Sequence, residues 1–160
     1  MSGQVLVVGV GNRYRRDDGV GLVTAGRLRL LVPAGVHVVT HEGEPLSLLA
    51  LWQAADAVWL VDAAAPAGAP GTVHRFEASD RPLSFERCRC STHALDLAEI
   101  IELARALGVL PPRLIVYGIE GADFGVGEGL SPAVTRASEV SAARIRGEIA
   151  TLWQKAGEWA

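Results

Sequence analysis

Three side chains that could together bind a catalytic metal ion stand at the ends of predicted secondary-structure elements. Asp18 follows a glycine-rich turn after an apolar strand, and Asp62 directly follows a second apolar strand at 57–61. His93 lies in the first turn of a helix predicted over 92–108. Two carboxylates and one imidazole from three separate elements would leave coordination positions open on nickel, zinc or manganese. Such a set resembles a catalytic site more than a closed structural one.

The pattern of the helix over 92–108 supports a place for His93 in this group. Apolar residues recur three or four positions apart after it, so the imidazole extends the buried stripe and points toward the sheet. A helix N-terminus disfavours the imidazolium form, which leaves a neutral ring able to bind a metal. The alternative is a hydrogen-bonded histidine of the core. Asp17 has two alternatives as well, a cap of the first helix or a catalytic base.

A run of glycines surrounds Asp18. Gly9 and Gly11 would let the backbone turn sharply after the first strand, and Gly19 and Gly21 are costly at a helix start unless the backbone must lie close to a strand or a ligand. A dinucleotide site fits poorly, because Tyr14 stands where a third glycine is needed and two adjacent aspartates would repel a pyrophosphate.

Strands and helices alternate along the chain. This order predicts a three-layer α/β sandwich, with a twisted, mostly parallel five-stranded sheet and helices on both faces. The strand at 72–77 follows the previous one too closely for a crossover helix, so we expect it to be antiparallel. Ligands of such sheets bind beyond the carboxyl ends of the strands. The predicted helices cover about 17–32, 46–54, 92–108 and a segment that opens at Ser131-Pro132; the strands cover 5–8, 35–40, 57–61, 72–77 and 113–117.

The composition excludes several classes of protein. The 160 residues suit one domain, 1–160. Hydrophobic residues make up 49% of the chain and charged residues 21%, which indicates a globular protein. The net charge of −3 argues against a nucleic-acid partner, and no apolar stretch is long enough to span a membrane. The first strand begins too near Met1 for a signal peptide, so we expect a cytoplasmic protein.

Four motifs together resemble the nickel–iron hydrogenase maturation endopeptidases. They are Gly-Val-Gly-Asn-x4-Asp-Asp-Gly-Val-Gly (9–21), Val61-Asp62, Ser-Thr-His-Ala-Leu (91–95) and Gly-Leu-Ser-Pro (129–132). The resemblance implies a protease that removes a C-terminal extension from the hydrogenase large-subunit precursor after nickel insertion. It also implies that Asp18, Asp62 and His93 contact a nickel ion supplied by the precursor, with no organic cofactor.

The same resemblance implies further properties. Gly11, Asn12, Gly43 and Glu44 would contact the substrate, and the protein would act as a monomer. The sequence departs from the family pattern in the loop Glu42-Gly43-Glu44-Pro45, which is richer in glycine in many relatives, so the substrate subtype stays open.

Three alternatives remain. Cys88 and Cys90 with His93 could form a soft-metal site, or the cysteines could be reduced bystanders. The second alternative is a peptidyl-tRNA hydrolase, because those enzymes have a related Gly-x-Gly-Asn opening, but RNA binding requires a basic face. The third is a non-catalytic module that senses nickel or docks the precursor.

The glycine-rich stretch 118–129 also has two interpretations. It is either an ordinary surface loop or a lid that orders against the precursor.

Overall fold

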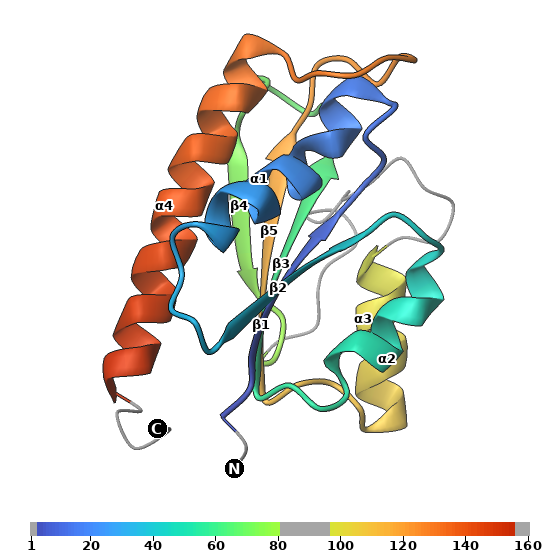
Figure 1. The fold of residues 1–160 in the computed structure, drawn as a ribbon. Coiled ribbons are helices and arrows are strands. Elements are labelled where there is room, and N and C mark those ends of the chain that lie inside the picture. Colours follow the sequence, from blue (N-terminus) through green and yellow to red (C-terminus); the bar gives the residue numbers. More distant parts are fainter. Residues whose placement is uncertain (1–2, 81–96, 156–160) are drawn as a thin grey trace.

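The computed structural model describes residues 3–80 and 97–155. Its five strands form one sheet in the order β2-β1-β3-β5-β4, in which only β4 runs antiparallel, to β5 (Figure 1). The predicted architecture and the antiparallel strand are therefore confirmed. The elements in chain order are β1 (Val5–Val10), η1 (Arg16–Gly19), α1 (Val20–Arg29), β2 (Val36–His41), η2 (Pro45–Ser47), α2 (Leu48–Trp52), β3 (Ala57–Ala64), β4 (Val73–Glu77), α3 (Leu97–Leu107), β5 (Arg113–Glu120) and α4 (Pro132–Lys155).

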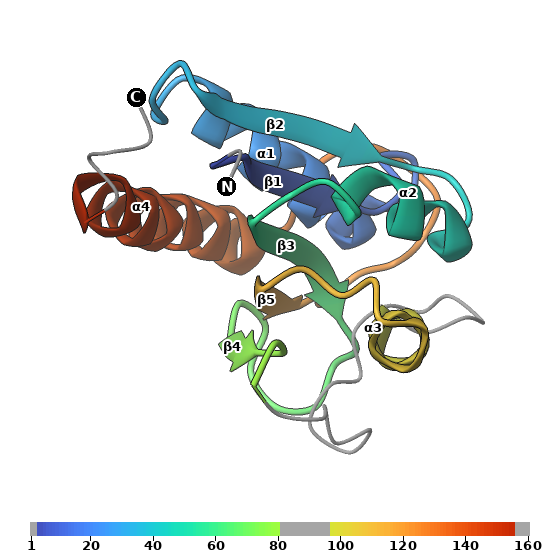
Figure 2. The ribbon, with the colours of Figure 1, turned by 90° about the horizontal axis from the view of Figure 1, so that it is seen from below.

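Helices cover both faces of the sheet (Figures 1 and 2). Alternate residues of each buried strand point to opposite faces, which produces two cores. Val58, Leu60 and their neighbours pack against α2 and α3, whereas Trp59 and Val61 pack against α1 and α4. The described residues contain no helix long and apolar enough to cross a membrane.

Two central strands run further than the sequence predicted. β3 and β5 pair in parallel from Ala57 and Arg113 to Ala64 and Glu120, and each strand extends because the other supplies its hydrogen-bond partners. Asp62 therefore lies inside β3, opposite Gly118, and the expectation that Asp62 ends its strand is wrong. The glycine-rich connection to α4 begins at Gly121 for the same reason.

The start of the first helical segment also differs from the prediction. The segment expected as one helix over 17–32 divides into the 3₁₀ turn η1 and the ten-residue helix α1. A Cβ at Gly21 would overlap the carbonyl oxygens of Val10 and Val61, and one at Gly9 would overlap the backbone of Gly21. These glycines allow α1 to lie directly on β1 and β3, as the cost of glycine at a helix start suggested.

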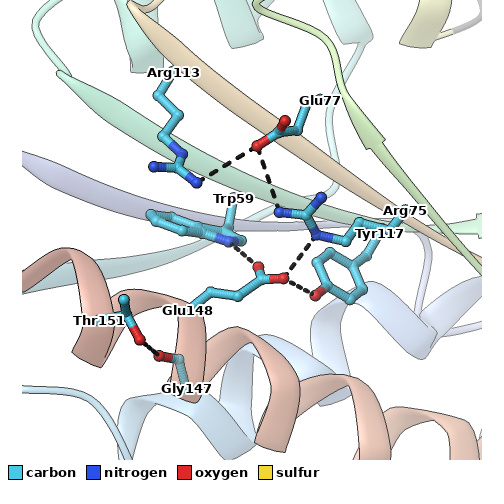
Figure 3. Close-up of polar contacts among 8 residues, drawn as sticks. All are labelled: Trp59, Arg75, Glu77, Arg113, Tyr117, Gly147, Glu148 and Thr151. Carbon is cyan, nitrogen blue, oxygen red and sulfur yellow. Dashed lines mark hydrogen bonds and ion pairs between the residues drawn. The ribbon is translucent and has the colours of Figure 1, made fainter.

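One carboxylate attaches α4 to the sheet. Glu148 accepts hydrogen bonds from Trp59 Nε1 (2.8 Å), Arg75 Nε (2.7 Å) and the Tyr117 hydroxyl (2.8 Å), as Figure 3 shows. The pKa of the Tyr117 phenol is raised to about 12, mainly because the group is buried and also because it donates a hydrogen bond to Glu148. Three donors from three strands thus meet one acidic group of the helix.

Glu148→Gln should lower the free energy of unfolding by about 1–3 kcal/mol, because the amide removes the charge and turns an NH₂ group toward at least one of the three donors. Chemical denaturation measures this loss. Glu99→Gln, at an exposed position of α3, is the matched control and should change stability by less than about 0.5 kcal/mol. Equal stability of the two variants would show that the Glu148 contacts contribute little.

Candidate active site

The turn between β1 and η1 holds Asp18 in a buried position. The Asp18 side chain has no exposed surface, and its Oδ2 accepts a hydrogen bond from the Asn12 N–H (3.1 Å). The Asp18 carbonyl lies against Gly11, where φ is +153° and a Cβ would overlap that oxygen. Gly11 and Asn12, which the family resemblance assigns to substrate binding, therefore shape the turn that positions Asp18.

Asp62 lies at the same edge of the sheet. It is 1% exposed, and its Oδ1 accepts a hydrogen bond from the Ala63 N–H (2.8 Å). Gly21, one helical turn after Asp18, contacts the carbonyl oxygen of Val61, the residue before Asp62. Asp18 and Asp62 therefore both lie near the carboxyl ends of the parallel strands, on the contacting elements η1 and β3. Buried carboxylates are costly unless donors, protons or cations compensate them, and such groups are often found at functional sites.

The neighbouring Asp17 has a different task. Its side chain is fully buried and accepts hydrogen bonds from the backbone N–H groups of Ala122 (2.8 Å), Asp123 (2.9 Å) and Ser131 (2.7 Å), and from the Ser131 hydroxyl (3.0 Å). Burial alone would raise the pKa of Asp17, but these bonds outweigh it and hold the pKa below its ordinary value. Asp17 caps neither η1 nor α1, so the predicted capping role is wrong.

The contacts of Asp17 also bear on the glycine-rich connection between β5 and α4. Backbone hydrogen bonds of 2.9 Å join Arg16 N–H to Gly127 O, Asp17 N–H to Asp123 O and Gly127 N–H to Tyr14 O. The segment is therefore bound along its length to the turn that carries Asp18. A lid that swings open here would first have to break these bonds, and the structure favours a fixed wall of the site.

Asp17→Asn should lower the free energy of unfolding by about 2–4 kcal/mol, because the amide leaves buried N–H donors unpaired. The amides of 122, 123 and 131 should exchange faster with deuterium. The pKa of Asp17 is depressed in the fold, so its contribution is present above the ordinary carboxyl pKa of about 4 and disappears as pH falls through the lower folded pKa. The stability difference between wild type and variant should shrink across that acidic range.

Asp123→Asn is the control for Asp17→Asn, because Asp123 belongs to the same connection but its side chain is 55% exposed. We expect it to leave exchange at 131 unchanged. Identical protection of 131 in wild type and Asp17→Asn would contradict the role of Asp17 as the anchor of this connection.

A fourth buried carboxylate, Glu120, ends β5, where the sequence predicted only a glycine-rich loop. Glu120 is 3% exposed and accepts hydrogen bonds from the N–H groups of Ala67 and Gly68 (both 2.8 Å), and it pairs with His74 Nε2 at 2.9 Å. Burial raises the pKa of Glu120, but the His74 bond and the two N–H bonds prevail and lower it. Glu120 thereby fixes the loop that leaves β3 after Ala64, two residues beyond Asp62.

The loop after β2 contains the other residues that the resemblance assigns to substrate. Glu44 caps η2, accepting hydrogen bonds from Leu46 N–H (2.8 Å) and Ser47 N–H (3.0 Å). Glu42 forms a two-point ion pair with Arg13, with nitrogen–oxygen distances of 3.1 and 2.9 Å. Gly43 lies between these two acids, so the loop is fastened to the β1–η1 turn that positions Asp18.

His93, Cys88 and Cys90 lie outside the described residues, so the predicted imidazole ligand and the thiol alternative are not located by the structure. Within residues 3–80 and 97–155, no group of three His, Cys, Asp or Glu side chains is placed to hold a metal ion.

Comparison with known proteins connects this geometry to one family. Residues 29–148 match the model of the HycI hydrogenase maturation proteases, a match that begins after the turn bearing Asp18 and includes Asp62. The chain is 28% identical to the hydrogenase 2 maturation protease of Escherichia coli (strain K12), with 82% of this chain and 81% of that protein covered. It is 27% identical to the hydrogenase expression/formation protein HupD of Thiocapsa roseopersicina over 85% of this chain and 66% of that protein. The chain spans 62–66% of the length of three such relatives.

Solved structures share the fold. The NiFe hydrogenase maturation protease HycI of Thermococcus kodakarensis KOD1 superimposes with a TM-score of 0.72 at 25% identity, covering 92% of each chain. An endopeptidase from Escherichia coli gives a TM-score of 0.79 at 24% identity, covering 96% of this chain and 94% of that one. The described sheet and helices therefore have the architecture of these proteases.

Proposed function

Because the chain belongs to the hydrogenase maturation protease family, we propose that it is an endopeptidase that removes the C-terminal extension of a nickel–iron hydrogenase large-subunit precursor. The observation that carries the proposal is that two buried carboxylates, Asp18 and Asp62, stand near the carboxyl edge of the sheet on the contacting elements η1 and β3. They come from separate elements, and each is positioned by backbone contacts rather than by a flexible loop.

This arrangement suits hydrolysis of a bond that is presented beside a metal. Peptide hydrolysis needs a polarised carbonyl, an activated water molecule and a substrate strand held in register. In our proposal Asp18 and Asp62, with His93, bind the nickel-bearing end of the precursor, and the nickel belongs to the substrate. The walls made by the Asp17-bound connection and the Glu120-bound loop would hold the scissile segment in place.

The test is to incubate the purified protein with nickel-loaded precursor and follow the precursor by electrophoresis. We expect a shift to a shorter form that does not appear without the protein. A stable complex of protein and intact precursor would instead favour the non-catalytic docking module. The match to the hydrogenase maturation protease model favours a protease over the peptidyl-tRNA hydrolase alternative.

A further inference from the structure

A groove along the outer side of α1 borders the candidate active site. It encloses about 450 Å³ and runs from Gly19, the residue after Asp18, to the last turn of α1. Leu22, Val23 and Leu130 give it apolar surface, and Val23 is 37% exposed. Ten helical residues at about 1.5 Å each make α1 about 15 Å long, which matches about four or five residues of an extended peptide.

The charge of the groove is opposite to that of the chain as a whole. Its lining contains one acid, Glu128, and the four arginines Arg13, Arg16, Arg27 and Arg29, in a chain of net charge −3. Three of these arginines have ion-pair partners: Glu42, Asp123 and Glu139, at 2.9, 3.5 and 3.6 Å. These pairs are exposed and therefore weak, so the guanidinium groups can still attract an anion. The described residues include no ion-pair partner for Arg29.

We infer that this groove binds the end of the precursor's C-terminal extension, with the arginines of α1 pairing with its terminal carboxylate. The inference rests on the proposed function. Every C-terminal extension ends in an α-carboxylate whatever its sequence, and arginine binds carboxylates through two parallel hydrogen bonds. The apolar floor would accept the side chains just before that end, and the position beside Asp18 connects the groove with the cleavage edge.

The first experiment measures binding of a synthetic peptide with the sequence of the extension, in free-acid and C-terminally amidated forms, by fluorescence anisotropy. We expect the wild-type protein to bind the free acid about tenfold more tightly than the amide. In Arg27→Gln/Arg29→Gln the two forms should bind alike. The control Arg136→Gln/Arg146→Gln removes two exposed arginines of α4 outside the groove and should preserve the preference. Equal affinity of the wild-type protein for both forms would overturn the inference, even if the variants failed to fold.

The second experiment separates this inference from the proposed function. For cleavage of intact nickel-loaded precursor, Arg27→Gln/Arg29→Gln should raise KM about tenfold and leave kcat within about twofold of wild type. If the wild-type protein cleaves the precursor and this variant shows no change in KM, binding in the groove would be refuted and the proposed protease function would stand. If the wild-type protein fails to cleave the precursor, the proposed protease function would be refuted, and the preference for the free-acid peptide would still test binding in the groove.

Discussion

Asp62→Asn and Asp18→Asn should each abolish cleavage of the precursor, with a loss of at least about 10²–10³-fold in rate. Both substitutions keep the size of a buried side chain and remove its negative charge from the place where the nickel-bearing segment would bind. His93→Ala should have the same effect, on the strength of the sequence motif. A rate assay at saturating precursor measures all three variants.

Asp56→Asn is the control for these variants. Asp56 precedes β3 at the amino edge of the sheet, where its Oδ2 accepts the Gln4 N–H at 2.9 Å, whereas Asp62 lies near the carboxyl edge. We expect Asp56→Asn to cleave at close to the wild-type rate. Wild-type rates for Asp18→Asn and Asp62→Asn, in proteins that unfold cooperatively, would remove these residues from the mechanism.

A second large effect concerns the source of the metal. We expect the purified protein to cleave nickel-loaded precursor in the presence of a chelator and to leave nickel-free precursor intact. Two aspartates and one histidine make a modest site without the two-histidine helix motif of resident-zinc peptidases. Such a site can be completed by a metal that arrives on another protein, and only then would the scissile bond be in register.

The comparison requires both precursor forms, each with and without zinc added to the protease. Our account predicts cleavage in the two nickel-loaded samples only. Cleavage of nickel-free precursor once zinc is supplied would mean that the metal belongs to the protease.

The parts of this fold that depend on neighbouring residues could be predicted from the sequence. Continuous apolar runs predicted the central strands, and the Ser131-Pro132 pair predicted the start of α4. The glycines at 9 and 21 predicted a close approach of helix and strand, which the structure confirms. Asp18 could be chosen because it follows a glycine-rich turn, and Asp62 because it follows a continuous apolar run.

The missed features all depend on contacts between distant parts of the chain. Asp17 binds residues 105 to 114 positions away, so its sequence neighbours indicated only a cap of the first helix or a catalytic base. The extra length of β3 and β5 exists because the two strands pair with each other, which no local pattern encodes. Glu120 was placed in a loop for that reason, although it closes β5 and holds the segment after β3.

The most direct test of the account is the intact mass of nickel-loaded large-subunit precursor after incubation with the wild-type protein and, separately, with Asp62→Asn. We predict that the wild-type protein converts the precursor into one shorter species, together with a peptide whose mass equals that of the missing C-terminal segment. Asp62→Asn should leave the mass unchanged. An unchanged precursor mass with active, folded wild-type protein, or equal processing by both proteins, would contradict the account.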